Sequence, residues 1–188
     1  MSAFPPESDI LPALLGADAA GAQPRSPLED EVVGLFDQFR DRLLRYLLSF
    51  GLPVSDCEEL IQETFLALFQ HLRRGRSRRN LPSWLFRVAH NLALKKRLRL
   101  RRDTLMTSAP DSVIDPSPSP EDQSVSNQTH KRLLAVLRAL PEQNRRCLAL
   151  RAEGLRYREI AEVLDMSLGA VSLSLGQSLA RLARARER

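Results

Sequence analysis

The stretch that most constrains this chain is residues 154–182, GLRYREIAEVLDMSLGAVSLSLGQSLARL. Its apolar residues recur at helical spacing on both sides of a short corner, Asp165-Met166-Ser167. We expect a first helix from about Tyr157 to Leu164. Ser167 is placed to cap a second helix, because its hydroxyl can accept a backbone N–H of the first turn. The pattern favours a helix-turn-helix, whose second helix enters the major groove of DNA, over an ordinary helical hairpin.

The composition favours an all-α fold. Aromatic residues make up only 5% of the 188 residues, and Leu, Ala, Arg and Glu dominate. The net charge of +5 points weakly to a polyanionic partner. Cys57 and Cys147 lie too far apart for a disulfide framework, and the three histidines have no companion ligands at metal spacing, so we expect neither metal nor cofactor. The N-terminus lacks a signal-peptide pattern and no apolar stretch is long enough for a bilayer, so we expect a cytoplasmic protein without membrane insertion.

Proline-rich and small residues in 1–28 predict a disordered tail, and a helical domain follows at 29–102. A first helix starts at Glu29 and stops before Gly51 and Pro53. Ser55, three residues before Glu58, has the spacing of a capping box for the second helix. One face of that helix is polar, which fits either a solvated surface or a docking surface; its residues are Glu59, Gln62, Glu63 and Gln70.

Residues 73–102 contain twelve Lys or Arg and no acid. We expect a helix from about Pro82, on which Arg87, Asn91, Lys95 and Arg99 fall four apart and line one exposed face. Like charges stacked in this way repel, and a phosphate backbone would relieve the repulsion, so the pattern favours nucleic acid over a merely solvated face. Trp84 and Phe86 could stack on an unpaired base, but a core position is the better explanation for Trp84.

Residues 103–128 have no Lys or Arg and carry four prolines among serines and acids, which predicts a flexible, extended linker. We therefore expect two small helical domains, the second at 129–188 and containing the helix-turn-helix. Neither a nucleophile with its base nor a phosphate-cradling glycine loop is present, so we expect no enzymatic activity.

Two motifs in this order resemble the extracytoplasmic-function (ECF) group of bacterial RNA polymerase sigma factors. The first is DCEELIQETFLALFQHL at 56–72, followed by LPSWLFRVAHNLALKKRLR at 81–99. The second is ALPEQNRRCLALRAEGLRYREIAEVLDMSLGAV at 139–171. With the intervening helices, the resemblance covers about 29–102 and 129–182, which is most of the chain, and the paired motifs across a polar linker make it highly specific.

The resemblance implies a region 2-like domain that binds core RNA polymerase and melts the minus-ten element of promoter DNA, and a region 4-like domain that reads the minus-thirty-five element. It implies that an anti-sigma factor is a further possible partner. The polymerase contacts that it implies are Asp56, Glu59, Leu60, Gln62, Glu63 and Phe65. The DNA contacts that it implies are Arg87, Asn91, Lys95, Lys96, Arg99, Ser167, Ala170, Ser172, Ser174, Gln177 and Arg181.

The chain departs from the family pattern at several positions. The family usually has an acid in place of Lys95, a serine cap in place of Arg156 and a glycine in place of Asp165. Its recognition helix tends to carry Lys and Arg where this chain has Ser172, Ser174, Gln177 and Leu179. Phosphate attraction from this helix should therefore be weak, since each lost cation removes close to one unit of salt slope. The alternative function is a two-domain helix-turn-helix regulator that acts on duplex DNA without replacing a sigma factor.

Overall fold

The computed structural model describes residues 26–107 and 125–186, and the regular structure in these ranges is entirely α-helical. The predicted all-α fold is confirmed. Most of the predicted tail at 1–28 and of the predicted linker at 103–128 lies outside the described residues, which exclude 1–25 and 108–124.

Three helices form the first domain: α2 (Pro27–Leu48), α3 (Val54–Arg73) and α4 (Leu81–Thr107). Ser26 caps α2, because its hydroxyl accepts the N–H of Glu29 at 3.3 Å while the Glu29 carboxylate accepts the N–H of Ser26 at 2.8 Å. Gly51 turns the chain between α2 and α3 with a φ of 73°, a conformation that favours glycine.

The predicted capping role of Ser55 is wrong. Helix α3 begins at Val54, its N-cap is Pro53, and no side chain caps it. The carbonyl of Pro53 accepts the N–H of Cys57 at 3.0 Å, so Ser55 already lies inside the first turn. The proline ring fixes φ near its helical value, which starts the helix before the serine.

The second domain consists of α5 (Val125–Ala139), α6 (Glu142–Ala152), α7 (Tyr157–Leu164) and α8 (Leu168–Arg186). Helices α7 and α8 are bent by 106° relative to each other, the geometry of a helix-turn-helix. Asp165 makes the corner in the left-handed region, at a φ of 53°. The Ser167 hydroxyl accepts the N–H of Ala170 at 3.2 Å, so the predicted cap is confirmed.

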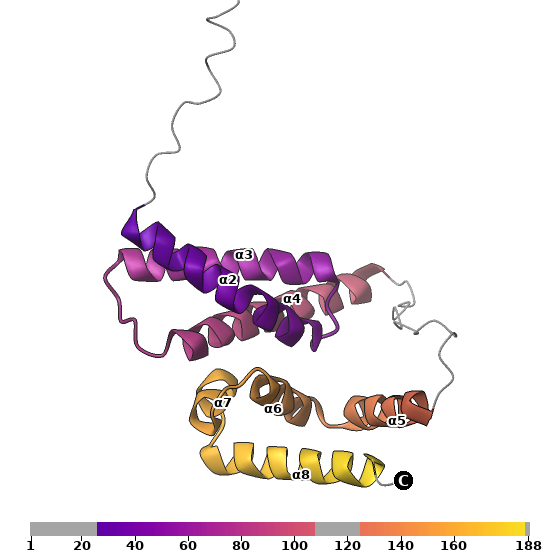
Figure 1. Ribbon diagram of the computed structural model, residues 1–188. Coiled ribbons are helices and arrows are strands. Elements are labelled where there is room, and N and C mark those ends of the chain that lie inside the picture. The colour runs from indigo at the N-terminus through magenta and orange to yellow at the C-terminus, as the bar shows by residue number, and fades with distance from the viewer. Residues whose placement is uncertain (1–25, 108–124, 187–188) are drawn as a thin grey trace, which may run out of the picture.

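The two domains pack against each other. In Figure 1, α6 and α7 lie beneath α2 and α4, and α8 is the element farthest from the first domain. Buried apolar side chains of both domains form one continuous cluster. It includes Leu43, Tyr46 and Leu68 from the first domain, and Leu150, Ile160 and Leu175 from the second. The sequence predicts two domains and does not predict that they share a core.

Tyr46 and His90 form a buried polar pair where α2 meets α4. Tyr46 Oη and His90 Nδ1 share a hydrogen bond of 2.7 Å. Burial, with a further contribution from the nearby charge of Arg146, lowers the pKa of His90 from 6.5 to about 4. Burial also raises the pKa of Tyr46. Both side chains are therefore neutral at pH 7, as a buried site requires.

The folded-state pKa of His90 predicts that acid destabilises the protein below neutral pH. Because the pKa is lowered on folding, the unfolded chain binds the proton first, and stability is lost as pH falls from about 6.5 toward 4. We expect His90 to cost about 1–2 kcal/mol between pH 7.5 and pH 5. Urea unfolding at the two pH values measures this loss. The variant His90→Gln should lack it, whereas His130→Gln, at an exposed position, should keep the wild-type response.

Candidate nucleic-acid interface

The exposed face of α4 carries the predicted stripe of cations. Arg87, Asn91, Lys95 and Arg99 are all exposed, as their four-residue spacing predicts. We call these four residues the α4 stripe. Phe86, which comes just before it, is fully buried and packs edge-on against Tyr46 at 5.5 Å between ring centroids. The stripe therefore presents three cations and one amide to solvent. The opposite side of α4 packs in the core and holds the helix in place.

Lys96 does not belong to this stripe. It faces α3, where Nζ lies 2.8 Å from Oε2 of Glu59 and 3.3 Å from Oδ1 of Asp56. The hydrogen bond to Lys96 lowers the pKa of Glu59 and raises that of Lys96. Lys96, which the resemblance implies as a DNA contact, is thus paired with Asp56 and Glu59, which it implies as polymerase contacts. The sequence alone does not predict this pairing.

The polar face of α3 is exposed at Glu59, Gln62 and Glu63, and half-buried at Asp56. Two further residues of the predicted polymerase set, Leu60 and Phe65, lie in the core with 3% and 6% of their surfaces exposed. Their side chains pack behind the polar face. The exposed residue that sequence reasoning missed is Leu66, which is 59% exposed. Its position, four residues after Gln62, is the signal that could have found it.

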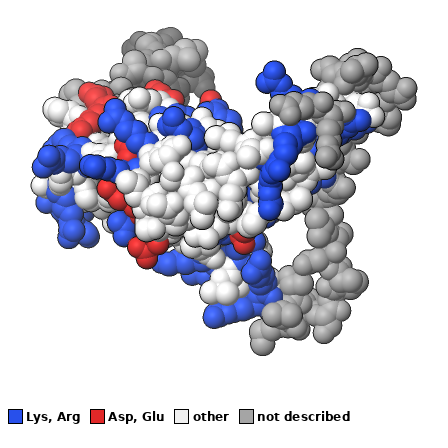
Figure 2. Space-filling view, turned by 90° about the horizontal axis from the view of Figure 1, so that it is seen from below, with Lys and Arg blue, Asp and Glu red and all other residues white. Residues whose placement is uncertain are grey.

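The outer face of α8 is uncharged over its first three turns. Ser172 and Gln177 are exposed there, together with Leu168, Leu173 and Leu179. Figure 2, seen from the side on which α8 lies, shows a broad surface without charged residues, bordered by Lys and Arg and by some Asp and Glu. No single described helix is long and apolar enough to cross a membrane, although α7 and α8 together, as a bent pair, have the length and composition.

The other predicted DNA contacts of the second domain divide by burial. Ser167 and Arg181 are exposed, and Ala170 is half-buried. Ser174 is buried, with 9% of its surface exposed. Its backbone carbonyl accepts hydrogen bonds from Asn144 Nδ2 at 3.4 Å and from Ser178 Oγ at 2.7 Å. Ser174 thus faces the core, because three residues after Val171 it returns to the inner side of the helix.

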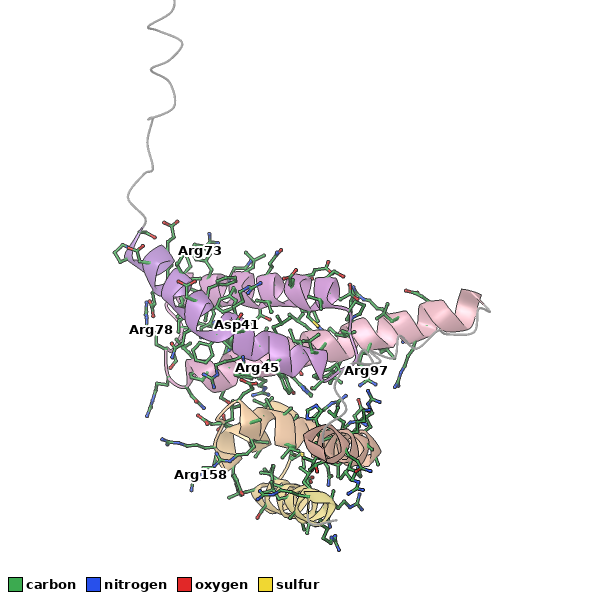
Figure 3. All side chains as sticks on the ribbon, turned by 45° about the vertical axis from the view of Figure 1, so that its right-hand side comes forward. Asp41, Arg45, Arg73, Arg78, Arg97 and Arg158 are labelled. Atoms are coloured by element: carbon green, nitrogen blue, oxygen red, sulfur yellow. The ribbon has the colours of Figure 1, made fainter. Side chains whose placement is uncertain are left out.

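Cations gather beside α8 in a groove of about 1080 Å³. Its charged lining consists of three arginines and two carboxylates: Arg79 from the loop before α4, Arg156 at the N-cap of α7, and Arg158, Glu159 and Glu162 on α7. Leu168 and Ser172 at the start of α8 complete it. Figure 3 labels Arg158, whose side chain extends from α7 away from the rest of the domain. The sequence offers the RYRE run at 156–159 as a signal for the two α7 arginines, but only tertiary structure brings Arg79 to the same groove.

Two family models match the chain in sequence order. Sigma-70 region 2 matches residues 35–103, and Sigma-70, region 4 matches residues 130–188. The ECF RNA polymerase sigma factor SigE of Mycolicibacterium smegmatis is 33% identical over 158 residues, which cover 82% of this chain and 60% of SigE. The protein named Probable RNA polymerase sigma factor RfaY, from Xanthomonas campestris pv. campestris, is 33% identical over 138 residues, covering 71% of this chain and 34% of RfaY. The chain thus spans less than two thirds of the length of each of these two relatives.

The fold also resembles a solved structure. The sigma factor RpoE of Bartonella quintana, crystallised with the anti-sigma factor NepR, has a TM-score of 0.58 to this chain at 19% sequence identity. The match covers 82% of this chain and 97% of RpoE. At this identity the likeness concerns the fold, with both helical domains included.

The pairing of Lys96 predicts a change in the titration of Glu59. Replacing Lys96 with Ala removes the hydrogen bond and the charge that lower the pKa of Glu59, so this pKa should rise toward that of a free glutamate. Carboxyl-detected NMR titration measures the shift. Lys95→Ala removes a neighbouring cation on the exposed face of the helix and should leave the titration of Glu59 unchanged. A shift of equal size in that variant would show that net charge, and not the contact with Lys96, sets the pKa of Glu59.

Proposed function

Because this chain belongs to the ECF group of the sigma-70 family, we propose that it binds core RNA polymerase and directs transcription initiation at selected promoters. The observation that carries this proposal is the order of the two matched regions, region 2 and then region 4, over the two helical domains. The chain itself would perform no catalysis: it would supply promoter specificity to an enzyme that it joins and leaves. Polymerase and chromosomal DNA are cytoplasmic in bacteria, so we expect the chain to act there.

We propose the polar face of α3 as the main polymerase contact. Glu59, Gln62 and Glu63 are exposed on it, and Leu66 adds an apolar contact of the kind that anchors protein interfaces. Asp56 lies at the edge of the same face. Leu60 and Phe65 would act indirectly, by holding α3 against α2, where Phe65 meets Phe36 edge-on at 5.0 Å between ring centroids.

The α4 stripe would hold the separated promoter strand. Its three cations neutralise phosphates, and the Asn91 amide can bond the edge of an unpaired base. Binding of the unpaired strand lowers the free energy of the melted state, so no ATP is needed to open the duplex. Residues 29–102 would form the melting domain, and 129–188 the domain that reads the upstream element, joined by the chain between α4 and α5.

The second domain would contact duplex DNA with a mostly uncharged reading helix. Ser167, Ser172 and Gln177 are exposed hydrogen-bonding groups that can reach base edges. Phosphate contacts would come from the flanks of α8: from Arg156 and Arg158 at the start of α7, and from Arg181 in the second half of α8. We also propose an anti-sigma partner, because the structurally similar RpoE was solved in complex with one.

Polymerase binding is tested with Glu63→Arg. Reversing an exposed charge on the α3 face should weaken binding to purified core polymerase by roughly tenfold, about 1.4 kcal/mol, if that face is the contact. Affinity pull-down and fluorescence titration with core enzyme measure the change. Asp37→Arg makes the same reversal at an exposed site on α2 and should bind like wild type. A wild-type chain that binds promoter duplex tightly but does not bind core enzyme would instead favour the helix-turn-helix regulator.

Strand capture is tested with Asn91→Ala. Loss of the amide should reduce run-off transcription from a duplex promoter by roughly tenfold, because each good base contact contributes about 1–3 kcal/mol. A pre-melted bubble template should recover most of the activity, and binding to core polymerase should stay unchanged. Arg76→Ala removes an exposed cation in the loop before α4 and serves as the control. Equal losses on duplex and bubble templates, together with weaker core binding, would indicate a structural role for Asn91.

A further inference from the structure

The outer face of α8 carries one large side chain at its centre. Leu173 is 63% exposed, the largest exposed fraction among the large apolar residues that the structure describes. Gly169, Gly176 and Ala180 are exposed one or two turns away and lie on the same face of the helix, because residues three or four apart are neighbours there. Leu173 therefore projects from a face that otherwise carries little side-chain bulk.

The fold itself does not require a glycine at position 176. Gly176 lies inside α8 without a positive φ, and an added Cβ would meet no atom within 4 Å. Glycine inside a helix is less stable than alanine, because it loses more backbone freedom on folding. Its advantage is that another body can approach the backbone closely. The surface around Leu173 is therefore suited to contact with a partner.

Arginines stand on both sides of this uncharged face. Residues 168–180 contain no Asp, Glu, Lys or Arg. Arg156 and Arg158 lie beside the start of α8, and Arg181 and Arg184 follow in its second half. Such a distribution suits a groove of duplex DNA, which has a phosphate strand along each side. A second copy of the chain on the same face would bring the arginines of both copies together, so the charges favour duplex DNA as the occupant.

The two carboxylates beside the start of α8 are held by the protein itself. Glu159 Oε2 accepts the backbone N–H of Arg156 at 2.6 Å. Glu162 accepts Asn80 Nδ2 at 3.3 Å and Ser83 Oγ at 3.2 Å. These hydrogen bonds leave the arginine side chains of the groove as the groups that can contact phosphates.

The side chains on the outer face fit one kind of base pair. Thymine presents an apolar group, its C5 methyl, in the major groove, and apolar side chains contact it there. Guanine is read most often by Arg or Lys, and residues 168–180 contain neither. Gln177, which is exposed one turn after Leu173, can bond both N6 and N7 of adenine. A leucine and a glutamine on an uncharged helix are therefore suited to A·T base pairs.

We propose that α8 selects A·T base pairs, with Leu173 packed against a thymine methyl and Gln177 bonded to a nearby adenine. The proposal rests on the proposed function for the promoter element in which these pairs lie, whereas the selectivity is a property of α8 itself. Because the phosphate contacts come from the flanks, a few base contacts decide which duplex is bound. Leu173 is then a residue that determines specificity, and Gly176 lets the helix come close enough for the contact.

The contact is tested by removing the methyl group from the DNA. The full chain is used to select from a pool of short duplexes randomised at their centre, at about 50 mM salt, where phosphate attraction is strong. The selected duplexes should be rich in A·T pairs. Each thymine is then replaced singly by deoxyuridine, which lacks only the methyl group. At one position the affinity of wild type should fall about fourfold, the effect expected for one methyl-sized group withdrawn from water.

The variant Leu173→Ala identifies the side chain that touches this methyl. It should bind the thymine duplex less tightly than wild type and should not distinguish thymine from uracil, because both changes remove one contact. Leu179→Ala removes another exposed leucine of α8 and should keep the full uracil effect. Selected duplexes rich in G·C pairs, no uracil effect at any position, or an undiminished effect in Leu173→Ala overturns the proposal.

Close approach at Gly176 is tested with Gly176→Leu. The variant should raise the midpoint of thermal unfolding, because leucine is the better helix former and the site is open. It should also weaken duplex binding roughly tenfold, the scale of an overpacked contact. Gly34→Leu makes the same change at an exposed and equally open site on α2 and should raise the midpoint without changing DNA binding. Unchanged DNA affinity in Gly176→Leu would show that this face does not approach the duplex.

Two further measurements separate the proposal from its alternatives. In sedimentation, a wild-type dimer that Leu173→Ala converts to a monomer would assign this face to a second copy of the chain and overturn the DNA contact. Selection of A·T duplexes through Leu173 without binding to core polymerase would support the contact and contradict the proposed function. Promoter-specific transcription that uracil substitution does not change would support the proposed function and overturn the contact. Failure of the full chain to bind any duplex, alone or with core enzyme, also overturns it.

Discussion

A shared apolar core is the constraint on which the arrangement of this molecule depends, and a carboxylate held between two guanidinium groups lies beside it. Glu153 lies just after α6 and meets Arg42 and Arg45 of α2 at the place where the two helical domains join. Withdrawing these charges from water is costly, and the forked hydrogen bonds offset much of that cost, so the net gain from the pair is small. A contact with strong geometry and a small net free energy helps to specify how the two domains are oriented more than it adds to stability.

Charge is distributed differently over the two domains. In the first domain, an acidic polar face on α3 and a cationic stripe on α4 are neighbours, and Lys96 bridges them by bonding Asp56 and Glu59. Occupation of the α3 face by a partner would therefore change the electrostatic surroundings of α4. In the second domain α8 is uncharged in its first turns, and three arginines, Arg79, Arg156 and Arg158, lie beside it together with Glu159 and Glu162.

The amino-acid sequence predicted much of the candidate site where the signal was periodic. The α4 stripe is exposed because residues four apart must share a helix face, and Ser167 caps α8 because its hydroxyl lies at the right spacing. The predictions were less successful where a family pattern was carried over without regard to burial. Leu60 and Phe65 lie in the core, and Ser174 faces inward, since a helix turns each successive side chain by about 100°.

The sequence by itself determined the all-α fold, the helix-turn-helix and the separation of cationic and acidic faces, because these follow from local spacing and turn chemistry. Only the tertiary structure decided that Lys96 bonds α3, that Arg79 joins the arginines of α7, and that Glu153 joins the two domains. Each of these contacts links residues that are distant in the chain. Their formation depends on how whole helices pack, and no local pattern of residues specifies that packing.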